Sequence, residues 1–383
     1  MNIPFHIPYH TEKEAAFVHE AIKNGCISGD GYYTQMVQHF LEKEFGAKKV
    51  LMTTSATHAL EMAAILIDLK PGDEVLMPSY TFPSTANAVM LRGATPVFVD
   101  IKDTTLTMDL DDMLGKLTSR TKAIIPVHYA GIGCEMDEIM NIARDWGLYV
   151  IEDAAQAVNA KYKNQYLGTW GHIGCYSFHG TKNYTSGEGG AILLNSQDEE
   201  FLNRGEVLWQ KGTNRKAFMR GDVEQYQWVD IGSSYTPSDL LMAFLAAQLE
   251  NLEDIRNCRQ WIHQYYTEQL KSLVEEEYIR TITIPEPCQS NYHLYYIRFK
   301  NEATRNRVKE KLASKGIAAA THFVPLHSSP MGQRYGYHRY DLPVTEKVSK
   351  TLLRLPMYTS MTEEALVYVV KQLVSSIKEG ETI

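Results

Sequence analysis

The stretch that decides the fold is Tyr149-Val150-Ile151-Glu152-Asp153-Ala154-Ala155-Gln156, in which a short apolar run passes directly into two acids. An apolar run of this length predicts a buried strand. Ligands of open α/β sheets bind beyond the carboxyl ends of the strands, so a carboxylate at Asp153 is placed to keep the ring nitrogen of a ligand protonated. The alternative is that Asp153 caps a helix, because aspartate is favoured at strand-to-helix turns.

The same alternation of short apolar runs and helical patterns extends from about residue 50 to residue 195. We expect strands at residues 49–53, 74–78, 95–100, 122–127, 149–153, 174–178 and 191–195. Helices are expected to begin near Thr57, Ser84, Asp111 and Glu135. Strands that alternate with helices indicate an α/β fold with a mostly parallel sheet and crossover helices.

The rest of the chain is organised differently. Residues 195–220 are expected to form a helix and a polar loop, and residues 237–270 carry one long helical pattern that can join two domains. A strand at 292–299, a helix at 304–315, the segment 318–325 and an amphipathic stretch at 362–377 indicate a small α+β domain. With 383 residues, the chain fits a large domain at 1–255, which includes an N-terminal arm, and a small C-terminal domain at 256–383.

The composition argues against several classes of protein. The formal net charge is −8 without a basic block, which is not typical of a protein that binds nucleic acid or an anionic membrane. The five cysteines contain no CxxC pair and indicate neither a disulfide framework nor a zinc ribbon. Prolines and charges interrupt the N-terminus, and no apolar run of about 18 residues occurs. We therefore expect a cytoplasmic protein with neither a signal peptide nor a membrane span.

A lysine follows the strand expected at 174–178, within Ser177-Phe178-His179-Gly180-Thr181-Lys182-Asn183 and ahead of Gly187-Glu188-Gly189-Gly190. Its amine must lose a proton to attack an aldehyde, and burial or a neighbouring cation can lower its pKa from about 10.4 toward neutrality. The glycines permit tight turns and close backbone approach, which an ordinary loop does not require. We therefore favour a cofactor-binding role for Lys182 over that of a solvated surface lysine.

Other segments carry weaker signals. The helix expected near Thr57 opens directly after a strand, so its first amides and the Thr57 hydroxyl can receive a phosphate, although an ordinary N-cap is the alternative. Neither a Walker loop nor a GxGxxG motif occurs. Phe82 can stack on a planar cofactor or pack in the core. His322 and His327 lack a third ligand nearby, so we expect no metal site.

In their order along the chain, these motifs resemble those of the DegT family of nucleotide-sugar aminotransferases, from near Pro4 to the C-terminal helix. Four segments look most like the branch that contains dTDP-4-amino-4,6-dideoxygalactose transaminase. They are Leu91-Arg92-Gly93-Ala94, Pro126-Val127-His128-Tyr129-Ala130-Gly131, Gly212-Thr213-Asn214-Arg215 and Asp230-Ile231-Gly232-Ser233-Ser234-Tyr235. The resemblance implies the aspartate-aminotransferase-like (type I) fold and a pyridoxal 5′-phosphate enzyme with pyridoxamine 5′-phosphate as an intermediate.

The resemblance also assigns roles to residues. Lys182 matches the lysine that holds the cofactor as a Schiff base, and Asp153 matches the partner of the pyridine nitrogen, so both are expected to be catalytic. The other implied cofactor contacts are Ala56, Thr57, Phe82, Gln156 and Ser177. Many relatives have an asparagine that reaches the cofactor phosphate of the neighbouring subunit, where this chain has the shorter Ser234. The cross-subunit contact of these relatives implies a homodimer with shared active sites.

The implied reaction moves an amino group from L-glutamate to C4 of a dTDP-4-keto-6-deoxyhexose. The products are 2-oxoglutarate and a dTDP-4-amino-4,6-dideoxysugar of galactose configuration, for use in amino-sugar and polysaccharide biosynthesis. Candidate substrate neighbours are Tyr9, His322, His327 and Tyr335.

Three alternatives remain: amination at C3 of a dTDP-3-keto-6-deoxyhexose, a related sugar dehydratase, and a non-catalytic regulatory or binding protein with the same fold. Lys182 disfavours the dehydratase, because that branch has histidine in its place. The presence of Lys182, Asp153, Gln156 and Ser177 together disfavours a non-catalytic protein.

Overall fold

The computed structural model describes residues 1–379, and its centre is a seven-stranded sheet. Its strands are β1 (Lys49–Thr53), β2 (Glu74–Pro78), β3 (Thr95–Val99), β4 (Thr121–Ile124), β5 (Tyr149–Asp153), β8 (Ile173–Ser177) and β9 (Gly190–Leu194). They lie in the order β1-β9-β8-β5-β4-β2-β3. β9 runs antiparallel to β1 and β8, whereas the pairs from β8 to β3 are parallel. The expected α/β class with a mostly parallel sheet is confirmed.

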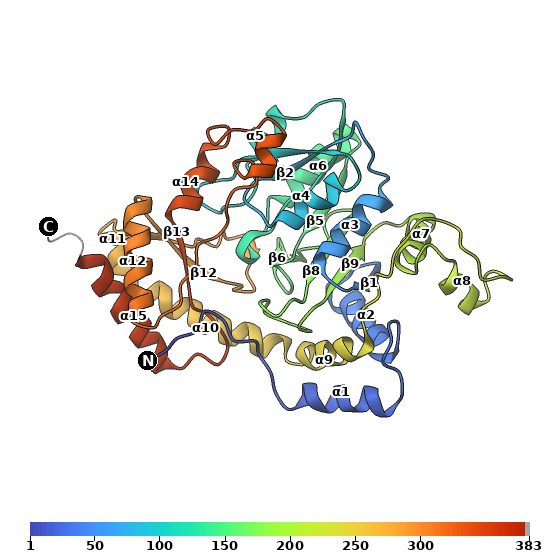
Figure 1. The fold of residues 1–383 in the computed structure, drawn as a ribbon, viewed down its shortest axis with the longest axis horizontal. Coiled ribbons are helices and arrows are strands. Elements are labelled where there is room, and N and C mark those ends of the chain that lie inside the picture. The colour runs from blue at the N-terminus through green and yellow to red at the C-terminus, as the bar shows by residue number, and fades with distance from the viewer. Residues whose placement is uncertain (380–383) are drawn as a thin grey trace.

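Helices cover both faces of this sheet (Figure 1). On one face lie α3 (Ala56–Leu66), α4 (Pro83–Met90) and α7 (Glu199–Trp209), and on the other lie α2 (Tyr32–Phe45), α6 (Met136–Trp146) and α9 (Asp239–Leu249). In β1, Val50 and Met52 join one hydrophobic cluster and Leu51 joins the other, because successive strand residues point to opposite faces. Burying each such side chain stabilises the fold by about 1.5–3 kcal/mol.

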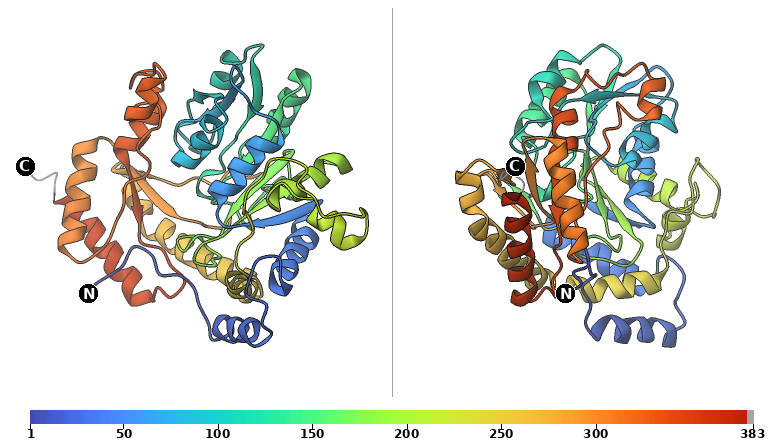
Figure 2. Two further views of the ribbon diagram at one scale, coloured as in Figure 1. Left: turned by 45° about the vertical axis from the view of Figure 1, so that its right-hand side comes forward. Right: turned by 60° about the vertical axis from the view of Figure 1, so that its left-hand side comes forward.

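A three-stranded sheet forms the centre of the C-terminal part. It consists of β10 (Ile279–Thr281), β12 (Tyr295–Phe299) and β13 (Leu352–Leu355), in the order β10-β12-β13. Around it are α12 (Glu302–Ser314), α14 (Pro343–Thr351) and α15 (Glu363–Lys378), and α10 (Leu252–Gln269) extends from the large sheet toward them (Figures 1 and 2). The domain boundary near residue 255 stays a prediction, and residues 380–383 of the expected small domain lie outside the described residues.

The remaining elements are α1 (Lys13–Lys23), α5 (Leu110–Gly115), a 3₁₀ turn (Tyr129–Gly131), β6 (Lys161–Tyr162), β7 (Gln165–Tyr166), α8 (Arg215–Arg220), α11 (Lys271–Glu275), β11 (Cys288–Gln289) and α13 (Pro330–Arg334). α1 and α2 precede the first expected strand, in a region for which the sequence pattern carried no prediction. The helices expected near Thr57, Ser84, Asp111 and Glu135 each begin within one residue of those positions.

The single helix expected over residues 237–270 is wrong, because α9 and α10 are separate helices. The break lies at Asn251. Its side-chain amide donates to Ala247 O (2.9 Å), the carbonyl that the Asn251 backbone amide would need in a continuous helix, and that backbone amide bonds Gln248 O instead. Competition of this kind between an asparagine side chain and the backbone ends helices.

Residues ahead of α1 form an extended arm that touches both parts of the molecule. Ile3 N donates to Gly316 O (2.8 Å), and Ala318 N donates to Ile3 O (3.0 Å). Three residues further on, His6 Nε2 lies 2.9 Å from Gly180 O, in the loop that follows β8. Within residues 1–379, no helix has the length and apolar character that a membrane span requires.

Candidate active site

A cavity of about 630 Å³ lies beyond the carboxyl ends of β5 and β8, as expected for an open α/β sheet. Its walls come from the arm, from loops that follow β1, β2, β5 and β8, and from segments 322–329 and 354–357. Two contacts fix the C-terminal wall to the sheet. Ser79 Oγ lies 2.7 Å from His327 Nδ1, and Asp100 Oδ1 accepts hydrogen bonds from Thr345 N (2.8 Å) and Thr345 Oγ1 (2.7 Å).

Lys182 lies in the loop between β8 and β9 and lines the cavity. The loop is closed by Gly180 N donating to Gly187 O (2.7 Å) and by Lys182 N donating to His179 O (2.9 Å). Gly187 has φ +82, a conformation that favours glycine. Burial lowers the pKa of the Lys182 amine to about 8; Asp153 opposes this shift, and Arg354 adds to it. About a tenth of the amine is therefore neutral at pH 7 and about half at pH 8, and this fraction is available for nucleophilic attack.

Asp153, the last residue of β5, is 6% exposed and lines the same cavity. Thr85 Oγ1 donates to its Oδ2 (2.7 Å), and Ala155 N donates to its Oδ1 (3.2 Å). Turns rather than a helix follow Asp153, so the structure does not support the alternative of a helix cap. The carboxylate is thus held by neighbours while part of it faces the cavity.

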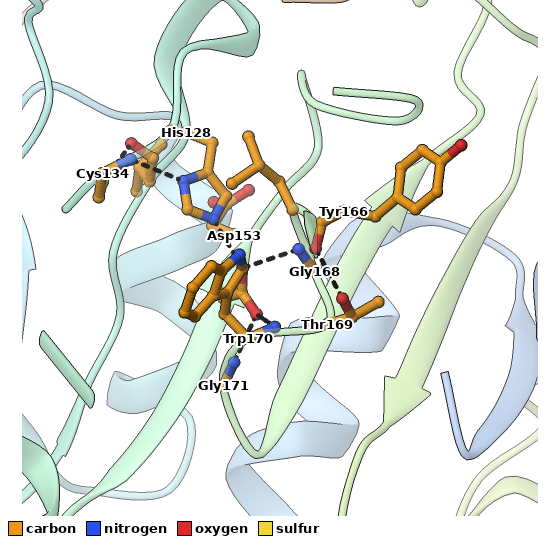
Figure 3. A network of polar contacts seen from close by, with 12 residues as sticks. His128, Cys134, Asp153, Tyr166, Gly168, Thr169, Trp170 and Gly171 are labelled. Carbon is orange, nitrogen blue, oxygen red and sulfur yellow. Dashed lines mark hydrogen bonds and ion pairs between the residues drawn. The ribbon is translucent and has the colours of Figure 1, made fainter. Parts of the chain in front are cut away.

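Glu152, the residue before Asp153, is fully buried in a network of hydrogen bonds, and its partners are labelled in Figure 3. Its carboxylate accepts from the backbone amides of Gly168 (2.7 Å), Trp170 (2.7 Å) and Gly171 (2.6 Å). His128 Nε2 lies 2.9 Å from Glu152 Oε2, and Cys134 N donates to His128 Nδ1 (3.2 Å). Because Nδ1 accepts, Nε2 carries the proton and donates to Glu152. The network fixes the end of β5 and with it the position of Asp153.

The N-terminus of α3 forms another wall, to which Ala56 and Thr57 contribute. Ser55 caps the helix by accepting from His58 N (3.1 Å), and Thr57 Oγ1 lies 2.7 Å from Ser84 Oγ. Gly190, the first residue of β9, lets the start of α3 lie close to the backbone of β9, since a Cβ at residue 190 would lie 2.4 Å from Ala56 N. The first amides of a helix have no partner inside it and carry its positive dipole end, so this wall suits an anion.

The other expected cofactor contacts also line the cavity, with one exception. Phe82 is 59% exposed, and Gln156 Oε1 accepts from Ala130 N (2.8 Å). Ser177, the last residue of β8, also lines the cavity. Ser234 does not line this cavity: it is exposed, one residue ahead of Tyr235, whose carbonyl accepts from Thr54 N (3.0 Å). The structure therefore gives Ser234 no place in the site of its own chain.

Of the four candidate substrate neighbours, His322 alone lines the cavity. Its Nδ1 lies 3.1 Å from Tyr129 Oη, and burial lowers its pKa to about 2. His327 is fully buried against Ser79, outside the cavity wall. Tyr9 and Tyr335 also lie outside the lining.

Several lining residues were missed from the sequence: Phe5, His6, Arg259, His293 and Arg354. Arg354 had a usable signal, because it is the one charge in the apolar run Leu352-Leu353-Arg354-Leu355. Phe5 and His6 had none, since only tertiary packing brings the arm here. Within residues 1–379, no group of three or more His, Cys, Asp or Glu side chains is arranged to hold a metal ion.

Comparison with known proteins identifies similar chains. The model of the DegT/DnrJ/EryC1/StrS aminotransferase family matches residues 8–374. The chain is 33% identical over 394 residues to the spore coat polysaccharide biosynthesis protein SpsC of Bacillus subtilis, covering 99% of this chain and 98% of SpsC. It is 31% identical over 376 residues to GDP-perosamine synthase of Escherichia coli O157:H7, covering 97% of each.

Among solved structures, Spr1654 of Streptococcus pneumoniae, assigned as a sugar aminotransferase, is similar over the whole length of both chains. Its PLP form has a TM-score of 0.92 at 27% sequence identity and covers 100% of each chain. Its PMP form has a TM-score of 0.91 at the same identity and covers 99% of this chain and 98% of that one.

Proposed function

The chain belongs to the DegT/DnrJ/EryC1/StrS aminotransferase family, and we propose that it transfers an amino group from L-glutamate to C4 of a dTDP-4-keto-6-deoxyhexose. It is a pyridoxal-phosphate-dependent sugar aminotransferase. The observation that carries the proposal is that Asp153, at the end of β5, and Lys182, in the loop that follows the neighbouring strand β8, line one cavity. The products would be 2-oxoglutarate and a dTDP-4-amino-4,6-dideoxysugar of galactose configuration.

The cavity fits pyridoxal 5′-phosphate, the cofactor of this enzyme. Lys182 supplies an amine of lowered pKa for its aldehyde, and Asp153 supplies a carboxylate for its pyridine nitrogen. The first amides of α3 and the Thr57 hydroxyl suit its phosphate. The exposed ring of Phe82 is available for stacking, and Gln156 keeps its amide nitrogen as a donor because its oxygen accepts from Ala130 N.

The residues divide the work of the reaction between them. When bound, the cofactor supplies an electron sink for the negative charge that develops at the reacting carbon. Lys182 Nζ removes the proton from the α-carbon of the amino donor and, in the second half of the cycle, delivers a proton to C4 of the sugar. Asp153 holds the ring nitrogen protonated throughout, and Thr85 orients the Asp153 carboxylate.

The C4 position and the dTDP nucleotide rest on the resemblance of four segments to one branch of the family. The name of the similar GDP-perosamine synthase refers to a GDP-linked sugar, so the nucleotide is the part of the proposal that most requires a test. The relation to SpsC, a polysaccharide biosynthesis protein by name, supports a role in supplying an amino sugar for a polysaccharide. Five free cysteines support a reducing, cytoplasmic location.

We further propose that two copies share their active sites. The segment from α8 onward exposes large apolar side chains, among them Met219 (70% exposed) and Trp228 (78% exposed), and it projects from the body of the protein (Figure 1). Exposed apolar side chains clustered in one segment are typical of an interface. Ser234 follows this segment, is exposed and does not line the cavity of its own chain, which supports a contact with the cofactor phosphate of a second copy.

The decisive experiment supplies the purified holoenzyme with L-glutamate and, separately, with dTDP-4-keto-, dTDP-3-keto- and GDP-4-keto-6-deoxyhexoses. NMR of each product then identifies the aminated carbon and its configuration. We expect amination at C4 of the dTDP-linked sugar. Amination only at C3, or only of the GDP-linked sugar, would replace the corresponding part of the proposal, and no transfer to any of the three would reject it.

A further inference from the structure

His6 connects the N-terminal arm to the loop that carries Lys182. Its Nε2 lies 2.9 Å from the carbonyl oxygen of Gly180, and His6 and Lys182 line the same cavity. A carbonyl oxygen can only accept a hydrogen bond, so Nε2 carries the proton and donates to it. The contact joins residues that are 174 positions apart in the chain, and through it the arm acts directly on the loop.

The arm is anchored on both sides of His6. Ahead of it, Met357 N donates to Phe5 O (3.3 Å), and behind it Gln248 Nε2 donates to Tyr9 O (3.0 Å). These contacts tie the arm to the C-terminal part and to α9, respectively. An arm that is fixed in this way can hold the loop in place, whereas a loose arm would only follow it.

The peptide that His6 holds lies within the turn that positions Lys182. Gly180 N donates to Gly187 O (2.7 Å), and Lys182 N donates to His179 O (2.9 Å). Glycine has no Cβ to restrict its backbone, so Gly180 does not by itself fix the direction of its carbonyl. Among residues 1–379, His6 provides the one hydrogen bond to this carbonyl. The contact therefore selects one path of the backbone between residues 180 and 182.

An alternative is that His6 contacts a substrate, because it lines the cavity. Such a contact through Nε2 would require the imidazole to leave Gly180 O. We propose instead that His6 is a positioning residue, which holds the loop so that the Lys182 amine reaches the same place in both half reactions. This inference rests on the proposed role of Lys182 as the proton carrier.

The first test compares wild type, His6→Phe and His6→Gln in each half reaction of the holoenzyme. Phenylalanine keeps a ring but removes the donor, whereas the glutamine amide nitrogen can take the place of Nε2. In His6→Phe, we expect the single-turnover rate at saturating substrate to fall about fivefold in both half reactions, as for the loss of one ordinary hydrogen bond. The half-saturating concentrations of L-glutamate and of the keto sugar should change less than about twofold, and His6→Gln should recover the rate to within about twofold of wild type.

The matched control is His10→Phe, because His10 is an exposed histidine of the same arm outside the cavity lining. This variant should react at the wild-type rate. A loss in one half reaction only, or a loss in substrate affinity instead of rate, would show that His6 contacts a substrate and would overturn the positioning role. Equal losses in His6→Phe and His6→Gln would overturn it as well.

Hydrogen exchange supplies a readout that does not depend on turnover. In the cofactor-free full-length protein, the amides of Gly180 and Lys182 should exchange about fivefold faster in His6→Phe than in wild type, and His6→Gln should restore their protection. The amides of β5 should keep their wild-type rates. Unchanged exchange at Gly180 and Lys182, or equally faster exchange throughout the large sheet, would contradict a specific hold on the loop.

The two measurements also separate this inference from the proposed function. A wild type that transfers no amino group from any L-amino acid, while its loop exchanges as expected in the three proteins, would reject the proposed function and leave the hold of His6 on the loop intact. Normal transamination by wild type together with unchanged exchange and rates in His6→Phe would reject the inference alone.

Discussion

His128 Nε2 lies 2.9 Å from Glu152 Oε2, and neither side chain has any exposed surface. Both carboxylate oxygens of Glu152 also accept backbone amides, Oε1 from Trp170 and Gly171 and Oε2 from Gly168. A neutral amide in place of this carboxylate would put its NH₂ group against two donors in either orientation. The network therefore requires an acceptor at both oxygens of residue 152, which an amide side chain does not provide.

Glu152→Gln is expected to lower the free energy of unfolding by about 2–6 kcal/mol, because two buried donors lose their acceptor at about 1–3 kcal/mol each. Chemical denaturation of the cofactor-free protein measures this change. Glu310→Gln, at an exposed position of α12, is the matched control and should change stability by less than about 0.5 kcal/mol. Similar midpoints for both variants would show that the network contributes little to stability.

The lowered pKa of Lys182 predicts how cofactor binding depends on pH. In the cofactor-free protein, the neutral fraction of an amine with a pKa of about 8 rises about tenfold per pH unit below that value and then levels off. The rate of covalent cofactor binding, followed by absorbance at about 410–430 nm, should therefore reach a plateau just above pH 8. A rate that continues to rise toward pH 10 would contradict the lowered pKa.

Lys182→Ala is the companion variant. It should lose the absorbance band and turnover together, because no other lysine lines the cavity formed by the described residues. Normal transamination by this variant would remove Lys182 from the mechanism.

Asp153→Asn is expected to fold and to slow the half reaction with L-glutamate by about 100- to 1000-fold, as expected for the loss of one preorganised electrostatic contact. Stopped-flow absorbance in a single turnover measures the rate, and circular dichroism checks the fold. Unchanged single-turnover rates would exclude Asp153 from its proposed role.

Thr85→Val tests the hydrogen bond that holds this carboxylate. The substitution keeps the side-chain shape and removes the 2.7 Å contact with Asp153 Oδ2, so we expect a roughly tenfold slower half reaction. Thr85 and Asp153 should be non-additive, because Thr85 acts through the carboxylate. Full additivity of Thr85→Val with Asp153→Asn would contradict that dependence.

The shared-site proposal predicts complementation between defective copies. Lys182→Ala and Ser234→Arg should each be inactive or nearly so as homodimers, since the first lacks the amine and the second places a large side chain near the partner's cofactor. A mixed dimer contains one site with Lys182 from one copy and Ser234 from the other, so mixing should restore activity. No recovery after exchange of subunits, verified by tagged copies, would argue against shared sites.

Trp228→Asp tests the interface itself. A charge at this exposed apolar position should weaken association, which light scattering after size-exclusion chromatography detects, and activity should fall with the dimer fraction. Tyr340→Asp, at a position that is 79% exposed outside this segment, is the control and should leave the molar mass unchanged. A Trp228→Asp protein with the wild-type molar mass and activity would place the interface elsewhere.

Local patterns predicted the large sheet well. The strands expected at 49–53, 74–78 and 149–153 have those same bounds in the structure, because each is a short apolar run with polar residues or glycine at its ends. The strand expected at 174–178 is displaced by one residue, to Ile173–Ser177. The break between α9 and α10 was missed, because it depends on one side-chain hydrogen bond of Asn251 and no glycine or proline marks it.

The site was predictable as far as it follows strand ends. Asp153, Ser177 and Lys182 lie at or just past such ends and all line the cavity, whereas their roles stay proposals. Tyr9 and Tyr335, which the resemblance suggested as substrate neighbours, lie outside the cavity lining, because the packing of distant segments decides which side chains reach the cavity. That Arg354 Nε has no hydrogen-bond acceptor within residues 1–379 could not be predicted, since it depends on which acceptors fail to reach it in three dimensions.

The extended N-terminal arm has a practical consequence for work with this enzyme. Ile3 pairs with residues 316 and 318, Phe5 lies over Arg354, and His6 reaches Gly180 in the loop that carries Lys182. An affinity tag fused directly ahead of residue 1, or a shortened start site, therefore acts on the active-site wall rather than on a remote end. Expression vectors for kinetic studies should separate an N-terminal tag from residue 1 by a cleavable linker, and tagged and tagless preparations should be compared before any kinetic constant is assigned to a mutation.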